Sequence, residues 1–508
     1  MKSAYHAHPK EGIKMKVMLI NPAPEHYTRA RCAPLGVLSI GSYLEANGHE
    51  VKVLNRATKS TDINAELDEF KPDFVGCSLL AVMSVKDCII VSKAAKARGI
   101  TVIWGGPFVT CSPEMTLELG CMDFISMGEG EETWLEILET AEKGGDLYSI
   151  KGLAYLKDGK TVKTPEREFT DLTKLPPINY ELIYPEETLY KNYDYDGIMG
   201  MYLSKGCTGH CTFCYNTDFH KNCRRSRDID VFIQEVKYLK ENHHLKAVAF
   251  ADELFGYNKA TLREICTKLI EADLGIHWGA MTKIGLFDKE DFQLMHDAGC
   301  RWLEFGIESG SKTTLARMKK GYNPGRVEED LENCRDVGII SLCYFIVGFP
   351  DETEEELRDT CSLVNRISYT KFVCSYFSPL PGSEIYDKLV AEGRHTPPKS
   401  MKECMKTRIF YSPKPNLSKV KSLDLKVVRC HILWSSFTKK SFIEDGKLNY
   451  SVAKKDILDV LRSLKGHGFK NGIEQFFASA YEFLDIFFYG NFFPRIVKKY
   501  GLDLKERK

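Results

Sequence analysis

The sequence predicts an α/β protein in which a doubly wound parallel sheet is followed by a partial (β/α)6 barrel of the TIM type and a mostly helical C-terminal region. Three observations predict this. Short apolar runs alternate with amphipathic helical patterns in the first third of the chain, six further strand–helix units follow in series, and strand patterns stop beyond Lys388. The length of 508 residues agrees, because about 150 residues per domain corresponds to about three domains.

The composition is that of a folded chain without a polyanionic partner. Hydrophobic residues make up 43% and charged residues 28%, which excludes a disordered chain. The 70 basic and 70 acidic side chains cancel, whereas a nucleic-acid-binding surface needs an excess of Lys and Arg. No apolar run of about 18 residues predicts a membrane span, and the first 14 residues lack the apolar core of a signal peptide.

The 17 cysteines indicate a reducing compartment. Their number is odd, and most stand alone in apolar runs, as Cys77, Cys88 and Cys266 do. Buried cysteine behaves as a small hydrophobic residue where disulfides do not form. We therefore expect a cytoplasmic protein, and we ask whether any of the cysteines are spaced for chemistry.

The first 145 residues predict the doubly wound sheet. Apolar runs predict five strands, at residues 15–21, 51–54, 74–78, 101–104 and 124–126, with helices at 35–47, at 85–97 and from 131. Such sheets bind ligands at the carboxyl ends of their strands, where this chain has Asn21, Ser78, Leu79, Gly105, Gly106, Gly128 and Glu129. Glycine there permits close approach of the backbone to a ligand. The alternative is that these glycines only form tight turns between strand and helix.

These patterns divide the chain into five regions: a polar tail at 1–14, the sheet region at 15–145, a hairpin and linker at 146–192, the barrel at 193–390 and the helical region at 391–508. Asp158-Gly159 supplies the turn of the hairpin. Pro176 and Pro177 mark the linker.

The barrel is predicted from six strands and the helical patterns between them. The strands fall at residues 199–204, 247–252, 277–281, 302–306, 341–347 and 372–378. Helical patterns occupy residues 229–242, 260–271, 289–298 and 354–366. Because a parallel barrel carries its chemistry at the carboxyl ends of its strands, the residues that follow each strand are the candidates for a site.

Three cysteines, Cys207, Cys211 and Cys214, directly follow the first barrel strand. The spacing C-x3-C-x2-C lets three thiolates converge from one loop on one metal centre. Three thiolates leave one iron of a four-iron cluster open for a ligand, unlike the four cysteines of electron-transfer ferredoxins. A structural zinc site is the alternative, but it needs a fourth ligand and usually a second pair, and the nearby His220 and Cys223 are out of register for one.

This loop resembles the radical S-adenosylmethionine (SAM) superfamily, in which a C-x3-C-x2-C motif with an aromatic residue before the last cysteine follows the first barrel strand. Further segments resemble the branch that carries an N-terminal cobalamin-binding domain. They follow the predicted strands in order and are Ala251-Asp252-Glu253-Leu254-Phe255, Gly306-Ile307-Glu308-Ser309-Gly310-Ser311, Met318-Lys319-Lys320-Gly321, Gly348-Phe349-Pro350-Asp351-Glu352-Thr353 and Pro379-Leu380-Pro381-Gly382-Ser383. The resemblance covers the sheet region and the barrel.

The resemblance implies that the three cysteines hold a 4Fe–4S cluster, and that SAM binds the open iron and is cleaved reductively to a 5′-deoxyadenosyl radical. Phe213 and the backbone of Tyr215 would lie beside the adenine, with ordinary packing at the barrel mouth as the alternative. Asp252 and Glu253 would face the SAM ammonium, and Glu308 would bond the ribose. Because a buried carboxylate needs a partner, structural ion pairs are the alternative for these three.

The resemblance also implies cobalamin in the sheet region, through Pro34-Leu35-Gly36, Gly105-Gly106-Pro107 and Gly128-Glu129-Gly130-Glu131. The residues at the strand ends would then contact it. The region lacks the Asp-x-His-x-x-Gly loop that supplies an axial ligand in some cobalamin domains, and His26 and His49 lack that context. We therefore expect cobalt to be held without a protein histidine. The alternative is that the fold remains and cobalamin binding has been lost.

The function implied by the resemblance is cobalamin-dependent methylation of an unactivated carbon or phosphorus centre (EC 2.1.1.-). A radical SAM cyclase or rearrangement enzyme that uses cobalamin differently or not at all is the first alternative, and a metal-stabilised interaction protein is the non-enzymatic one. The expected partners are a small-molecule or peptide substrate and an electron donor such as flavodoxin or ferredoxin. The aromatic-rich stretch at 475–493 predicts a core helix on the barrel or, alternatively, an interfacial helix or a lid.

Overall fold

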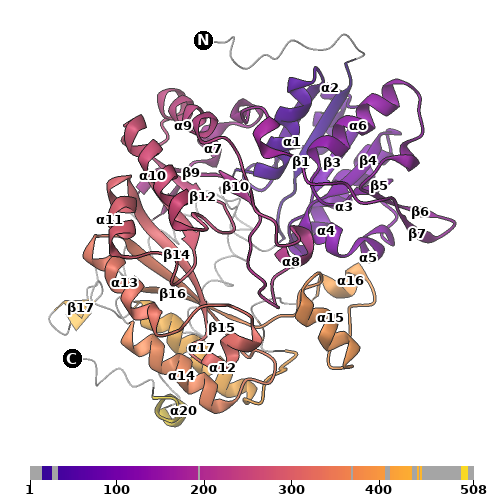
Figure 1. The fold of residues 1–508 in the computed structure, drawn as a ribbon. Coiled ribbons are helices and arrows are strands. Elements are labelled where there is room, and N and C mark those ends of the chain that lie inside the picture. The colour runs from indigo at the N-terminus through magenta and orange to yellow at the C-terminus, as the bar shows by residue number, and fades with distance from the viewer. Residues whose placement is uncertain are drawn as a thin grey trace.

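Two sheets of mainly parallel strands, each covered by helices, form the molecule (Figure 1). The computed structural model describes residues 14–25, 33–192, 195–367, 370–406, 412, 414–437, 443–444, 447–448 and 494–501. We call the part built on the first sheet, residues 14–163, the N-terminal unit. The second sheet, within residues 190–376, forms the barrel.

The first sheet has the strand order β2-β1-β3-β4-β5-β6-β7. The strands are β1 (Lys16–Asn21), β2 (Glu50–Asn55), β3 (Phe74–Ser78), β4 (Thr101–Gly105), β5 (Phe124–Ser126), β6 (Leu153–Lys157) and β7 (Lys160–Lys163). The first five are parallel, which confirms the predicted sheet, and β6 and β7 pair antiparallel. The predicted hairpin is therefore an extension of this sheet, next to β5.

Helices cover both faces of the first sheet, as a doubly wound fold requires. They are α1 (Leu35–Ala46), α2 (Ile63–Phe70), α3 (Val85–Lys96), α4 (Pro107–Cys111), α5 (Pro113–Leu117) and α6 (Glu131–Glu142). On one face, Leu38 of α1 and Trp134 of α6 enter a core that continues into the barrel. On the other face, Leu67 of α2 and Val91 of α3 enter a second core.

The second sheet has the order β16-β15-β14-β13-β12-β9-β8 and curves into a partial barrel of six parallel strands, as predicted. The parallel strands are β9 (Tyr195–Met201), β12 (Ala247–Phe250), β13 (His277–Thr282), β14 (Cys300–Glu308), β15 (Ile340–Val347) and β16 (Lys371–Tyr376). The short strand β8 (Tyr190–Asn192) pairs antiparallel with β9 at one edge.

The helices that return the chain between the barrel strands are α9 (Ile229–His243), α10 (Lys259–Ala272), α11 (Lys289–Asp297), α12 (Lys312–Arg317), α13 (Arg326–Asp336) and α14 (Glu354–Arg366). The barrel does not close on itself at β16. Helix α17 (Ser422–Phe437) packs there instead, and Arg429 Nε donates to the Cys374 carbonyl of β16 at 2.9 Å.

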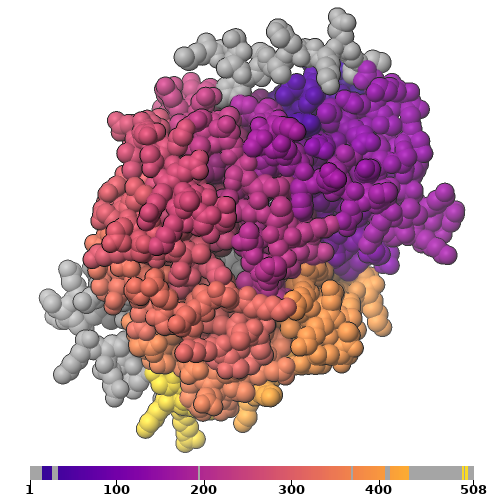
Figure 2. All heavy atoms as spheres, in the orientation of Figure 1, coloured from indigo at the N-terminus to yellow at the C-terminus, as the bar shows by residue number. Residues whose placement is uncertain are grey.

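The C-terminal region contributes three more short helices to the described chain, α15 (Glu384–Ala391), α16 (Met401–Cys404) and α20 (Pro494–Lys499). Met401 and Cys404 belong to the second core of the N-terminal unit, and Figure 2 shows this orange segment against the purple one. The region also has a small antiparallel pair, β17 (Ile443–Glu444) and β18 (Lys447–Leu448), so it is not purely helical. The aromatic-rich stretch at 475–493 lies outside the described residues.

The carboxyl ends of the two sheets meet. Cys111, at the end of the helix that follows β4, lies against the turn after β16, where a Cβ at Gly382 would be 2.6 Å from the Cys111 sulfur. Glu131, which follows β5, is 2.7 Å from Lys205, which follows β9. Segments that follow strands of both sheets therefore share one region of the molecule. In the part of the chain that the structure describes, no helix is long and apolar enough to cross a membrane.

Candidate active site

The three predicted cysteines lie in the loop of a short hairpin at the carboxyl end of β9. The hairpin strands are β10 (Ser204–Lys205) and β11 (Arg225–Ser226), which pair antiparallel with Lys205 opposite Arg225. Residues 206–224 connect them and include α8 (Asn216–Phe219). We call residues 204–226 the cysteine hairpin.

Gly206 determines how the loop leaves its first strand. Its φ of +85° lies in the left-handed region that favours glycine, and a Cβ at this position would collide with the carbonyl oxygen of Cys223. The backbone at the two ends of the loop is therefore in direct contact, and only glycine fits there.

The cysteine sulfurs face a shared space. A Cβ at Gly209 would lie 3.3 Å from Cys207 Sγ and 3.9 Å from Cys211 Sγ, and all three thiols are free. Burial raises the pKa of Cys211, and it raises the pKa of Cys214 to about 11.

The spacing of these thiols suits a cluster better than a single ion. Among the described residues, no three His, Cys, Asp or Glu side chains are close enough together to hold one metal ion. A structural zinc site requires four ligands around one ion. In a 4Fe–4S cluster each thiolate binds a different iron, so the sulfurs stay further apart. The donor set therefore fits the cluster that the sequence predicts.

The loop is fastened to the far side of the barrel through Thr212. Its amide donates to the Met318 carbonyl at 3.0 Å, and its hydroxyl donates to the Arg317 carbonyl at 3.2 Å. Its own carbonyl accepts from the Ile385 amide at 2.8 Å. The segments after β14 and β16 thus hold the middle of the loop between Cys211 and Cys214.

Asp252 holds the start of the cysteine hairpin. It lies two residues after β12 and is only 2% exposed. Its Oδ1 accepts from the Leu203 amide at 2.9 Å, and its Oδ2 accepts from the Ser204 hydroxyl. Burial raises its pKa to about 6. Both carboxylate oxygens have protein partners, so in this structure Asp252 acts on the loop that carries the cysteines.

Glu253, the next residue, also holds the cysteine hairpin. Its Oε2 accepts from the Gly206 amide at 2.9 Å, and its Oε1 lies 3.4 Å from His220 Nε2. Burial favours a raised pKa, but His220 and the Gly206 amide outweigh it and lower the pKa of Glu253. Burial is the main cause of the raised pKa of Tyr215, and the negative charge of Glu253 raises it further. Glu253 therefore holds the first residue of the loop, Gly206, and the nearby His220.

Glu308 ends β14 with a left-handed φ of +66° and is buried. Its Oε1 accepts a hydrogen bond from Lys320 Nζ at 2.7 Å. The same ammonium lies 5.9 Å from the ring centre of Phe213. Burial lowers the pKa of Lys320, but Glu308 and Cys211 outweigh it, so the pKa is raised overall. Glu308, Phe213 and Cys211 therefore share one region with the Lys320 ammonium.

Lys320 is a site residue to which the sequence assigned no role. The motif around it after the fourth barrel strand was recognised, but nothing in that pattern distinguishes Lys320 from Lys319. In the structure Lys319 turns outward to Glu384 at 2.7 Å and is half-exposed, whereas Lys320 is only 14% exposed.

The carboxyl edge of the first sheet offers a surface of small residues. Leu79 is buried and its amide donates to the Gly105 carbonyl at 2.7 Å. Gly106 has φ +104°, and a Cβ there would lie 2.8 Å from the Leu79 carbonyl oxygen. A Cβ at Gly128 would meet nothing within 4 Å. The backbones of β3 and β4 are thus in close contact, with open space beside β5.

Three further features of this edge fit a ligand that approaches the backbone. Asn21 donates its side-chain amide to Asn55 Oδ1 at 2.7 Å, and Ser78 ends the neighbouring β3. Ser126 Oγ, at the end of β5, is buried and has no hydrogen-bond partner among the described residues. Leu80 is 70% exposed directly after β3 and Leu79. Unsatisfied buried hydroxyls and exposed large apolar side chains are both features of binding sites.

The two histidines considered for this unit lie elsewhere. His49 precedes β2 and so lies at the amino edge of the sheet, opposite the residues described above. His26 is outside the described residues.

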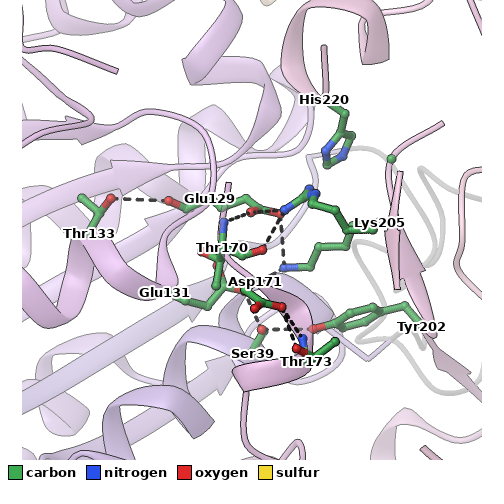
Figure 3. Close-up of polar contacts among 12 residues, drawn as sticks. Ser39, Glu129, Glu131, Thr133, Thr170, Asp171, Thr173, Tyr202, Lys205 and His220 are labelled. Atoms are coloured by element: carbon green, nitrogen blue, oxygen red, sulfur yellow. Dashed lines mark hydrogen bonds and ion pairs between the residues drawn. The ribbon is translucent and has the colours of Figure 1, made fainter. Parts of the chain in front are cut away.

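The side chain of Glu129 is held by the cysteine hairpin rather than exposed at that edge. Its carboxylate accepts two hydrogen bonds from Arg225, at 2.6 and 2.9 Å, and one from the Thr170 amide at 3.0 Å. Figure 3 shows Glu129 with Thr170 and Lys205 in one polar cluster. Only the Glu129 backbone remains available to a ligand of the first sheet.

Family models match both parts of the chain. The model described as "Radical SAM superfamily" matches residues 201–364, and the model described as "B12 binding domain" matches residues 28–138. The first match contains the cysteine hairpin, Glu308 and Lys320. The second contains the carboxyl edge of the first sheet.

The chain is a radical SAM enzyme with a B12-binding domain.

Relatives of this radical SAM enzyme are named for more than one activity. An uncharacterized methyltransferase of Pyrococcus horikoshii is 29% identical over 74% of this chain and 83% of its own length. An anaerobic magnesium-protoporphyrin IX monomethyl ester cyclase of Rubrivivax gelatinosus is 26% identical over 74% of this chain and 70% of its own.

Solved structures share its fold. The radical SAM methyltransferase TsrM from Kitasatospora setae, solved with tryptophan and a SAM analogue, superposes with a TM-score of 0.64 over 76% of this chain and 78% of its own, at 19% identity. The radical SAM family implies that the barrel binds a 4Fe–4S cluster and SAM, and the B12-binding domain implies that the first sheet binds cobalamin.

Proposed function

We propose that this radical SAM enzyme methylates an unactivated carbon or phosphorus centre in a small molecule or peptide, in a cobalamin-dependent reaction. The observation that carries the proposal is the meeting of the two carboxyl edges. The cysteine hairpin and the small-residue edge of the first sheet lie on the same side of the molecule, and Cys111 contacts Gly382 between them. A substrate in that region could be reached from both cofactor sites.

The cofactors supply the radical and the methyl group, and the chain supplies position. Cys207, Cys211 and Cys214 would hold the cluster. Glu308, which the resemblance assigns to the SAM ribose, is paired with Lys320, and Lys320 places a positive charge beside the proposed SAM site. Phe213 offers a ring face beside the pair.

Asp252 and Glu253 are proposed to act mainly on the loop. Their oxygens hold Ser204 and Gly206, and these contacts fix the cysteines at the end of β9. On the B12-binding side, Gly106 and Gly128 let the backbone come close to a large planar group. Ser126 Oγ is a free hydrogen-bond partner there among the described residues.

The reaction needs an electron from outside the chain. A low-potential iron–sulfur or flavin protein, such as a ferredoxin or flavodoxin, is the proposed donor. All described cysteines are free thiols, which agrees with the reducing cytoplasm in which such donors act.

A cyclase that releases 5′-deoxyadenosine without methyl transfer is the second candidate, because a cyclase is among the relatives. Its first half-reaction would use the same cysteines and the same SAM site. The two candidates differ in the fate of the SAM methyl group.

Anaerobic purification with quantitation of iron, sulfide and cobalt, followed by SAM turnover with and without added cobalamin, tests the proposal. We expect bound iron and sulfide, 5′-deoxyadenosine under reducing conditions, and S-adenosylhomocysteine only when cobalamin is present. Formation of 5′-deoxyadenosine alone would favour the cyclase. Cys207→Ala should abolish iron binding and SAM cleavage, whereas Cys223→Ala, which changes an exposed cysteine of the same loop, should leave both intact. Unchanged metal content in Cys207→Ala would overturn the proposal.

A further inference from the structure

A buried polar cluster joins the N-terminal unit to the base of the cysteine hairpin (Figure 3). Two carboxylates come from the segment after β5, Glu129 and Glu131. Two cations come from the hairpin strands, Lys205 of β10 and Arg225 of β11. We call these four residues the latch.

The first pair of the latch is Lys205 and Glu131. Lys205 Nζ donates to Glu131 Oε1 at 2.7 Å, and the Glu131 side chain is 2% exposed. Ser39 of α1 donates to the same Oε1 at 2.6 Å and lies 3.2 Å from the Tyr202 hydroxyl. Burial favours a raised pKa for Glu131, but Lys205 outweighs it and holds that pKa low. The N-terminal unit thus places the buried negative charge of Glu131 against Lys205, which lies two residues before the first cysteine.

The second pair is Arg225 and Glu129. The guanidinium donates to both carboxylate oxygens of Glu129, and such a fork fixes orientation as well as distance. Arg225 also lies 4.3 Å from the ring centre of Phe169, and the Thr170 amide completes the partners of Glu129. The side chain of Glu129 is 6% exposed.

The hairpin needs these carboxylates because of its own charges. Lys205 and Arg225 are directly opposite each other in the antiparallel pair, and like charges in opposite positions destabilise a two-stranded ribbon. Each strand has only two residues, which is too short to be stable alone. Glu129 lies between the cations, bonded to Arg225 and 3.8 Å from Lys205 Nζ. The ribbon that carries the cysteines is therefore neutralised by a different part of the fold.

We propose that Glu129 and Glu131 are positioning residues for the cluster-binding loop: through Arg225 and Lys205 they close the base of the cysteine hairpin and fix it relative to the B12-binding sheet. The inference rests on the cysteine loop being the cluster site, but not on methyl transfer. It makes the placement of the cluster depend on two residues of the other domain, neither of which touches the cysteines.

Hydrogen exchange on the full-length, cluster-loaded chain tests the latch. In the Glu129→Gln/Glu131→Gln variant, we expect peptides covering 204–226 to exchange roughly tenfold faster, because Lys205 and Arg225 lose the negative charges that neutralise them, while the first sheet keeps its protection. Asp87→Asn is the matched control. It breaks a similarly buried pair with Arg56, 2.8 Å apart and within the N-terminal unit, and should leave 204–226 unchanged.

A spectroscopic readout separates positioning from general stability. We expect the double variant to bind iron, since its three cysteines are intact, but to need roughly tenfold more SAM to produce the SAM-dependent change in the electron paramagnetic resonance spectrum of the reduced cluster. Lys205→Met should behave in the same way, and Lys205→Arg, which keeps the charge, should restore the parent titration.

Three results would overturn the proposal. One is unchanged exchange at 204–226 in the double variant. Another is equally faster exchange throughout the first sheet, which would mean general destabilisation. The third is failure of Lys205→Arg to restore the titration. If the double variant does not fold, the single Glu131→Gln variant and the two Lys205 variants give the same comparison. A parent protein without iron would contradict the proposed function and, with it, the role of the latch in positioning a cluster, whereas iron binding with unchanged exchange at 204–226 would overturn the latch alone.

Discussion

Lys320 is a largely buried cation of the proposed SAM site, bonded to Glu308 and beside Phe213. Replacing it by Met leaves Glu308 buried without its partner, and loss of one member of a buried ion pair costs about 3–5 kcal/mol. We expect Lys320→Met to retain iron but to weaken SAM binding at least roughly tenfold. Iron analysis and SAM titration of the reduced cluster measure the two effects. Lys320→Arg should bind SAM more tightly than the Met variant, and equal affinities would show that the charge is not what matters.

Gly206 offers a second test at the scale of one residue. A side chain at this position meets the Cys223 carbonyl oxygen, and the backbone of the loop must shift to avoid it. We expect Gly206→Ala to lose most of its bound iron. Gly285→Ala is the control, because Gly285 also has a left-handed φ, +79°, but a Cβ there meets nothing within 4 Å. The control isolates the backbone strain, about 1–2 kcal/mol. Equal iron loss in both variants would contradict the steric explanation.

The local spacing of the sequence predicts the cysteines but not their partners. Cys207, Cys211 and Cys214 lie within eight residues, so one loop brings them together. The hydrogen bond from Gly206 to Glu253 spans 47 residues, and the pair between Arg225 and Glu129 spans 96. Nothing in one sequence specifies such pairs. For this reason the sequence predicts Glu129 among the residues that would contact cobalamin, but it does not predict the pairing of its side chain with Arg225.

At the scale of elements, the turn between β15 and α14 carries a buried carboxyl group, Glu352. Its Oε2 accepts from the Gly348 amide at 2.7 Å, and its Oε1 has no partner among the described residues. Burial raises its pKa from an ordinary 4.5 to about 8, with Glu356 adding to the rise and Arg317 opposing it. The carboxyl group is therefore protonated in the folded protein at neutral pH.

This shift predicts a pH-dependent stability. Between about pH 4.5 and 8 the unfolded chain has released the Glu352 proton while the folded chain retains it, so the stability that Glu352 contributes falls as pH rises. Gln carries no such proton. We expect Glu352→Gln to gain melting temperature relative to the parent between about pH 5 and pH 8. Glu355→Gln, an exposed neighbour, should show no such trend. A difference between Glu352→Gln and the parent that stays constant with pH would refute the assignment.

Elements with a clear apolar pattern are predicted well, including the charged helix α14, whose observed bounds equal the predicted 354–366. β3 and β5 begin and end at the predicted residues because both are short and almost wholly buried. No helix is predicted at α13, RVEEDLENCRD, where few residues are apolar, or at α2, INAELDEF, which is only eight residues long. The partner of the predicted hairpin was not specified, because β6 joins β5 through pairing that local turn chemistry does not encode.

At the scale of the whole molecule, the end of the described chain returns to the barrel. Tyr500 is 2% exposed and its hydroxyl donates to Asp424 of α17 at 3.0 Å. Lys499 bonds the same carboxylate at 2.8 Å and Glu354 of α14 at 2.5 Å. The end of α20 and Tyr500 thereby tie α17, which covers the open side of the barrel, to α14.

Removal of this tie should destabilise the barrel. We expect Tyr500→Ala to lower stability by about 3 kcal/mol, through lost burial and the cavity left behind, and to lower the melting temperature measurably. Tyr500→Phe keeps the ring and loses one hydrogen bond, which is worth about 1 kcal/mol. Differential scanning calorimetry of the two variants measures both effects, and equal losses would mean that the hydrogen bond, not the ring, holds the chain end.

The latch also relates the fold to the order in which the chain is made. Glu131 precedes Lys205 by 74 residues, and all seven strands of the first sheet end before residue 164. Domains fold as units, N-terminal first, during synthesis. The first sheet can thus be complete on the ribosome, with two carboxylates still awaiting their cations, when the cysteine hairpin emerges. The nascent hairpin then meets a surface that already carries the opposite charge. The cysteine hairpin, which is synthesised later, can thus dock on the first sheet, which folds earlier.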